Sequence, residues 1–138
     1  MRNLMLTVRA FCVIPFVTGS LDLIDGVGLL KKAGVPLDEG SARDPMLNSQ
    51  IRFFGAIWLG YGIVLWRASS RLRTEADLFK LLCGILGLSG LARLASAIQY
   101  GFPGVPLGGA ILLEIVGSAG ALRWHASLLR RPDPDEAR

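Results

Sequence analysis

The sequence has few of the residues from which soluble catalytic and metal sites are built. Its 138 residues include one histidine, two cysteines and only 19% charged residues. Cys12 and Cys83 lie far apart within apolar runs, so they lack the spacing of zinc ligands and are expected to be small buried apolar side chains. A phosphate-binding glycine loop and a Ser/His/Asp arrangement are also missing. The sequence therefore predicts no metal and no cofactor, and a lone His125 is expected to lie at a membrane interface beside Trp124.

Apolar residues are abundant instead. They make up 51% of the chain and give a positive mean hydropathy of +0.46, whereas a soluble domain of this size needs more polar surface. Four apolar segments are each about 20 residues or more in length, enough helix to cross a bilayer core of roughly 30 Å. The predicted spans are about residues 4–30, 46–66, 78–100 and 107–129.

These spans predict an all-α fold, an integral membrane four-helix bundle. We expect a single four-span transmembrane domain over residues 1–129 and a disordered tail over 130–138. A soluble bundle would need a polar stripe on each helix, and residues 53–66 and 81–88 have none. A cleaved signal peptide at the N-terminus is the alternative for the first span, but no small-residue cleavage site follows it.

The basic residues lie mainly at the ends of the apolar runs. The net charge is +4, yet no recognition motif accompanies it, so we expect no nucleic-acid partner. Positive loops face the cytoplasm, which predicts that both termini are cytoplasmic and that membrane lipids are partners. The cations on this side are Arg2, Arg9, Arg67, Arg71, Arg73, Arg123, Arg130 and Arg131.

Four ionisable residues fall inside the predicted spans, namely Asp22, Arg52, Arg93 and Glu114. A charge in the bilayer core costs roughly 2.5–3.5 kcal/mol, so it usually has a partner or a function. Counted from the outer ends of the spans, all four lie roughly 6–10 Å below the outer surface. The sequence therefore predicts one polar cluster in the outer half of the membrane.

This predicted cluster has two interpretations that do not exclude each other. In the first, Arg93 pairs with Glu114 and Arg52 with Asp22, and the pairs fix the order of the helices. In the second, the cluster is a site in which Glu114 or Asp22 acts as an acid or base, while arginines bind a polar head. The candidate binding residues are Arg52, Arg93, Asp25, Gln99, Trp58 and Tyr61.

Small residues recur at helical spacing in the later spans, as in Ala56 and Gly60 or Gly117 and Ala121. Such residues let helix backbones approach closely. They indicate either packing within the chain or a homo-oligomer face.

Three functions are compatible with these features. The first is a non-catalytic accessory or assembly protein, favoured by the missing enzymatic motifs. The second is a membrane-embedded enzyme or binding site for a lipophilic small molecule, such as an isomerase, cyclase or hydrolase. The third is a small proton-coupled transporter, although the inner half offers no continuous path of ionisable groups.

Several short motifs also resemble a known family. They are an aspartate late in the first span (Asp22 or Asp25), the run Arg52-Phe53-Phe54-Gly55-Ala56 followed by Gly60 and Gly62, Arg93 ahead of Tyr100-Gly101-Phe102-Pro103, and Glu114. Over about residues 4–125 the sequence resembles the bacterial four-span membrane family called domain of unknown function 4345 (DUF4345). The resemblance implies a four-helix protein of the bacterial inner membrane, and it brings no established activity and no catalytic residues.

Overall fold

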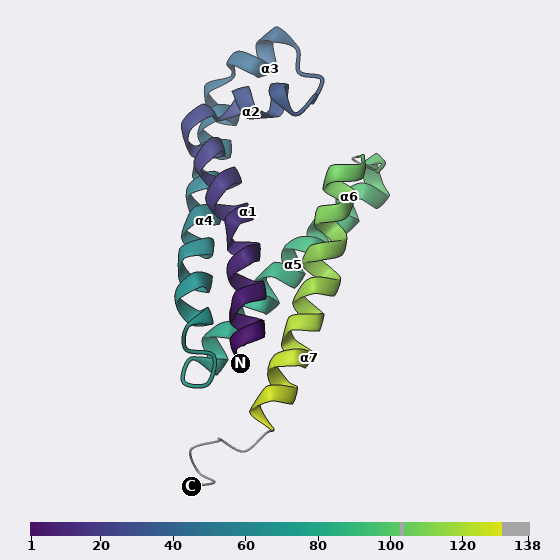
Figure 1. Ribbon diagram of the computed structural model, residues 1–138. Helices are drawn as coiled ribbons and strands as arrows, with labels where there is room; N and C mark the ends of the chain where they lie inside the picture. The colour runs from purple at the N-terminus through teal and green to yellow at the C-terminus, as the bar shows by residue number, and fades with distance from the viewer. Residues whose placement is uncertain (103, 131–138) are drawn as a thin grey trace, which may run out of the picture. The chain divides into compact units, whose positions relative to one another are not determined.

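The computed structural model describes residues 1–102 and 104–130, and all of their regular structure is helical (Figure 1). The predicted all-α class is therefore confirmed. Of the tail predicted to be disordered, residues 131–138 lie outside the described residues. The helices are α1 (Arg2–Asp25), α2 (Val27–Lys32), α3 (Glu39–Arg43), α4 (Pro45–Ser69), α5 (Ala76–Tyr100), α6 (Val105–Leu112), the π-helical turn η1 (Leu113–Gly117) and α7 (Ser118–Leu129).

Three helical stretches are long and apolar enough to cross a membrane: α1, α5 and the stretch Leu107–Leu129, which runs through α6, η1 and α7. With 25 residues, α4 has sufficient length. It contains Arg52 and is not among the three stretches that are apolar enough over a membrane-spanning length. The composition of α4 thus separates it from the other three long stretches.

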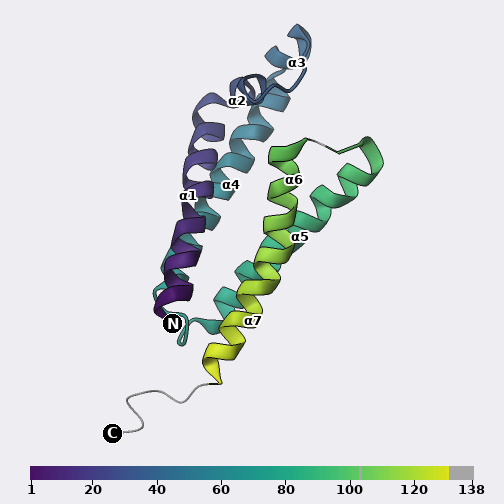
Figure 2. The same ribbon diagram turned by 45° about the vertical axis from the view of Figure 1, so that its right-hand side comes forward.

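The chain divides into two compact units. One, here called the α1–α4 unit, comprises residues 6–67, and the other, the α5–α7 unit, comprises residues 1–5 and the described residues from Ala68 on. In the first unit α1 and α4 run side by side, and α2 and α3 connect them (Figures 1 and 2). In the second, α5 packs against α6, η1 and α7.

Glycines allow α1 and α4 to approach closely. A Cβ added at Gly55 would lie 2.6 Å from the Cβ of Asp22 and 2.9 Å from the carbonyl oxygen of Gly19. A Cβ added at Gly19 would lie 2.8 Å from the backbone nitrogen of Leu59. Side chains larger than hydrogen are therefore excluded at this crossing, as expected where membrane helices pack through small residues.

The first apolar segment ends earlier as a helix than the predicted boundary at residue 30. Helix α1 stops at Asp25, and Gly26 has a φ of +59°, a conformation that glycine adopts with little strain. After this break the chain resumes as α2. In the following loop, Asp38 caps α3 by accepting a hydrogen bond from the backbone nitrogen of Ser41 at 2.7 Å. Hydrogen bonds from the side chain and backbone of Ser41 lower the pKa of Asp38.

His125 lies in the core of the α5–α7 unit and not at an interface as expected. It is 1% exposed, its Nε2 is 2.7 Å from the carbonyl oxygen of Leu72, and its ring contacts Phe79 with centroids 4.9 Å apart. A buried imidazole needs a polar partner, and the turn before α5 supplies one. The two cysteines are buried and free, as predicted.

Candidate functional site

The ion pair between Arg93 and Glu114 is the central feature of the candidate site. Nε of Arg93, on α5, lies 3.2 Å from Oε1 of Glu114, on η1. The Glu114 side chain is only 7% exposed, whereas that of Arg93 is 48% exposed. The carboxylate is therefore buried in the protein, and the guanidinium group faces both the carboxylate and the surroundings.

Close helix packing places these two side chains together. A Cβ added at Gly90, one turn before Arg93, would lie 2.9 Å from the Cβ of Glu114 and 2.7 Å from Cγ1 of Ile115. Glycine is thus required where η1 passes α5. The π-helical turn that carries Glu114 interrupts the α-helical register, and such turns are frequent at functional sites.

Glu114 is only partly satisfied by hydrogen bonds. Its Oε2 is buried and has no hydrogen-bond partner among the described residues. The hydroxyl of Ser89 is near the carboxyl group, but it donates to the carbonyl oxygen of Leu86 at 2.8 Å. Arg93 is therefore the main partner that the structure shows for this carboxylate, through Oε1.

A small pocket adjoins the guanidinium group of Arg93. Its volume is about 150 Å³. It combines one cation and one hydroxyl with apolar walls, which is the composition expected for binding a small polar group next to an apolar one. The lining residues are Arg93, Ser96, Ala97, Gly101, Leu107 and Ile111.

Asp22 and Arg52 lie in the other unit, where the structure gives Arg52 a structural role. Nη1 of Arg52 donates to the carbonyl oxygen of Leu23 at 2.7 Å, and its Nε donates to Oδ1 of Asn48 at 2.7 Å. Leu23 belongs to the last turn of α1, whose carbonyls have no partner within the helix. Arg52 therefore caps the C-terminal end of α1, where a positive charge is also favoured. Asp22 contacts α4 at Gly55, three residues away from Arg52.

The remaining candidate residues have separate environments. Asp25 accepts from Nζ of Lys32 at 2.7 Å across the α1–α2 break. Gln99 is exposed on α5. The ring of Trp58 stacks on Tyr61 with centroids 5.2 Å apart, and its Nε1 donates to Oγ1 of Thr18 at 2.9 Å.

The structure therefore shows an ion pair between Arg93 and Glu114 in the α5–α7 unit. In the α1–α4 unit, Asp22 lies against Gly55 of α4, the helix that also carries Arg52. The meeting of all four at one height stays a prediction. Among the described residues, no group of three His, Cys, Asp or Glu side chains is arranged to hold a metal ion.

The pocket beside Arg93 was not predicted, although the sequence contains a signal for it. Ser96 and Ala97 follow Arg93 by three and four residues, and Leu107 and Ile111 precede Glu114 by seven and three. Residues at these spacings share one face of a helix. The two charged residues thus mark the faces on which the other lining residues lie.

Comparison with known proteins assigns a family and no activity. No curated protein and no solved structure matches the chain. The family model described as a domain of unknown function (DUF4345) matches residues 4–125. Because this match covers most of the chain, the protein belongs to the DUF4345 family.

Proposed function

We propose that the chain is a four-span integral membrane protein of the bacterial inner membrane, with both termini in the cytoplasm and its spans packed as a four-helix bundle. Three helical stretches have the length and composition of spans. As the fourth span we assign α4, because it is 25 residues long and exposes large apolar side chains such as Phe53, Phe54 and Ile57. If α4 crosses the membrane, the arginines near residue 70 lie on the same, cytoplasmic side as Arg2, as the positive-inside rule requires.

A topology experiment tests the fourth span. Single cysteines at Ala42, in the loop before α4, and at Ser70, after it, would be labelled in intact cells with a membrane-impermeant maleimide in a background where Cys12 and Cys83 are serine. We expect labelling at Ala42 from outside and labelling at Ser70 only after the cells are permeabilised. Equal labelling at both positions from outside would show that α4 does not cross.

We further propose that the protein is a non-catalytic accessory protein that holds the polar head of a lipophilic small molecule at Arg93. The supporting observation is that Arg93, whose side chain is half exposed, lines a pocket while its Nε pairs with the buried Glu114. A volume of about 150 Å³ is below the roughly 300–1,000 Å³ of pockets that enclose a drug-sized ligand. The pocket therefore suits a head group whose apolar part lies in the bilayer.

The chemistry of the pocket narrows the class of ligand. Arginine binds carboxylate and phosphate groups through a planar pair of N–H donors, and Ser96 adds a hydroxyl group at the same pocket. Leu107 and Ile111 supply an apolar wall. We therefore expect an anionic or strongly polar oxygen-bearing head on a hydrophobic body.

Extraction of bound molecules tests this proposal. Protein purified in a mild non-ionic detergent would be extracted with organic solvent, and the extract compared by mass spectrometry between the wild type and Ala97→Phe, which fills the pocket. Ala92→Phe is the matched control, because Ala92 is exposed on the same helix and does not line the pocket. We expect at least one lipophilic molecule to be lost from Ala97→Phe and kept by Ala92→Phe. Identical extracts from all three proteins would contradict a ligand at this pocket.

A second candidate is an enzyme acting on the same class of molecule, favoured by the carboxyl group of Glu114, which lies 3.2 Å from the pocket-lining Arg93. An acid or base must lie within reach of the proton that it transfers. Glu114→Gln preserves the size of the side chain and removes this function. A different molecule accumulating in Glu114→Gln would support catalysis, whereas the same bound molecule in both proteins supports binding alone.

A further inference from the structure

A second pocket lies in the α5–α7 unit, at the turn that precedes α5. It is an open hollow of about 450 Å³. Three arginines, three hydroxyl-bearing residues and three apolar residues line it. They are Met1, Arg2, Met5, Ser69, Ser70, Arg71, Leu72, Arg73 and Thr74.

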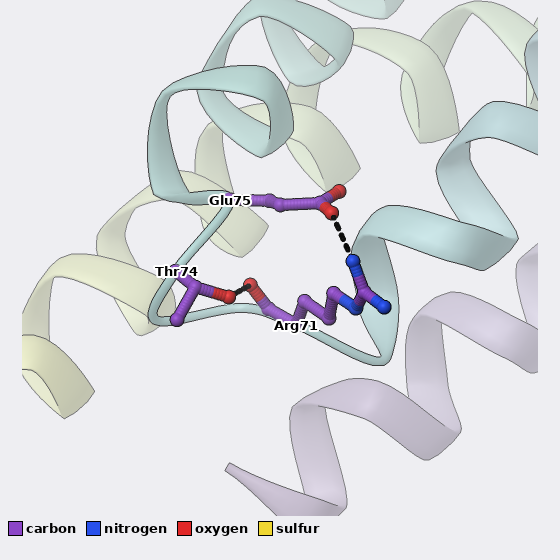
Figure 3. Close-up of polar contacts among 3 residues, drawn as sticks. All are labelled: Arg71, Thr74 and Glu75. Atoms are coloured by element: carbon purple, nitrogen blue, oxygen red, sulfur yellow. Dashed lines mark hydrogen bonds and ion pairs between the residues drawn. The ribbon is translucent and has the colours of Figure 1, made fainter.

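The turn that carries Arg71 is fixed by several contacts (Figure 3). Nη1 of Arg71 is 3.2 Å from Oε1 of Glu75, and Oγ1 of Thr74 donates to the carbonyl oxygen of Arg71 at 3.4 Å. Beneath it, Leu72 is buried and its carbonyl oxygen contacts the imidazole of His125. The backbone of the turn is therefore held by these contacts, and the guanidinium group of Arg71, whose side chain is 60% exposed, is oriented by Glu75.

The charge of this hollow is positive. None of its nine lining residues is acidic, and Glu75 beside it pairs with Arg71. All three cations are arginines, which bind phosphate through two parallel N–H donors. Met5 and Leu72 add apolar surface next to these donors.

A neighbouring hollow of about 400 Å³ shares Met1 and Arg2 with the first one. It is lined further by Trp124, Ser127 and Leu128, where an amphipathic ring is suited to the boundary between headgroups and acyl chains. The surface of this second hollow is mainly polar, so the apolar surface next to the arginines is that of the first hollow.

We propose that the arginine hollow binds the phosphate group of an anionic membrane phospholipid. The arginines contact the phosphate and the apolar residues contact the adjoining glycerol and acyl carbons. This inference rests on the proposed membrane location, in which the hollow lies at the cytoplasmic side, where anionic lipids attract basic residues. It is independent of the pocket at Arg93.

Lipid binding to the full chain tests the proposal. Protein in a neutral detergent would be titrated with phosphatidylglycerol or with phosphatidylcholine, and bound lipid counted by native mass spectrometry. We expect the wild type to prefer phosphatidylglycerol, and Arg2→Gln and Arg71→Gln each to bind it about fivefold more weakly, because one basic residue contributes about 1 kcal/mol near an anionic lipid. Glu75→Gln should bind it more tightly, because it frees Arg71.

The controls separate this site from a diffuse effect of charge. Arg67→Gln removes a cation close to the turn in the sequence, but Arg67 does not line the hollow. This variant should bind phosphatidylglycerol as the wild type does. Arg2 is outside the turn, so its variant tests the site even if changes at Arg71 disturb folding. Equal binding of both lipids by the wild type, or equal weakening by Arg67→Gln, would overturn the proposal. Displacement of phosphatidylglycerol by millimolar inorganic phosphate would overturn the lipid as the ligand and assign a site for free phosphate.

Discussion

Replacing Gly55 with alanine is expected to destabilise the protein by about 1–3 kcal/mol, the cost of inserting a methyl group into a packed contact. The new Cβ would lie 2.6 Å from the Cβ of Asp22, 2.8 Å from the backbone nitrogen of Leu23 and 2.9 Å from the carbonyl oxygen of Gly19. Two of these atoms belong to the backbone of α1 and cannot rotate away. The helices must separate, which removes contacts along α1 and α4. Thermal unfolding of the detergent-purified variant measures the loss.

Gly60 on the same helix provides a matched control. A Cβ added there meets no atom within 4 Å, and alanine favours a helix over glycine by up to about 1 kcal/mol. Gly60→Ala should therefore be neutral or slightly stabilising. If both alanine variants shift the unfolding temperature equally, the close approach of α1 and α4 at Gly55 does not limit stability.

The second large effect is expected at the Arg93–Glu114 pair, and it should be asymmetric. Arg93→Met leaves a carboxylate that is 7% exposed without its cation, so we expect a loss of about 2–3 kcal/mol, somewhat below the 3–5 kcal/mol typical of breaking a fully buried pair. Glu114→Leu leaves an arginine that is 48% exposed, which can reach polar surroundings. Its cost should be below about 1 kcal/mol.

The double variant Arg93→Met/Glu114→Leu completes the cycle. It should recover most of the stability lost in Arg93→Met, because apolar replacement of a paired site is often neutral or stabilising. The same thermal unfolding assay measures all three variants. A double variant as unstable as Arg93→Met alone would show that packing at these positions, and not the uncompensated carboxylate, determines the loss.

Much of the fold follows from the sequence for physical reasons. The long apolar segments can satisfy their backbone groups in a membrane only as helices, and the structure forms helices there. The break at Gly26 was not predicted, because the apolar character continues across it and only the positive φ ends the helix. The burial of His125 was also not predicted. Its partner is a backbone carbonyl, and because every residue has one, the sequence does not indicate which carbonyl the imidazole contacts.

The candidate site was predictable in part, because ionisable side chains in apolar segments also need polar partners. Arg93 and Glu114 each need an opposite charge within an apolar segment, and few are available, so their pairing follows from composition. Arg52 had the same need, and its predicted pairing with Asp22 stays a prediction. The structure shows that its guanidinium group donates to the Leu23 carbonyl and to the side-chain oxygen of Asn48. A cation can be neutralised by a helix end as well as by a carboxylate, and the sequence does not distinguish these solutions.

The contact between His125 and Leu72 has a consequence for biogenesis. The two residues are separated by 53 positions in the chain, so the ribosome completes the turn at Leu72 long before it synthesises the imidazole that holds it. Until α7 has been synthesised, the Leu72 carbonyl lacks this partner, and the arginine-bearing turn has only its local contacts, such as that of Arg71 with Glu75. A chain that ends ahead of residue 125 would thus lack the contact that joins this turn to α7.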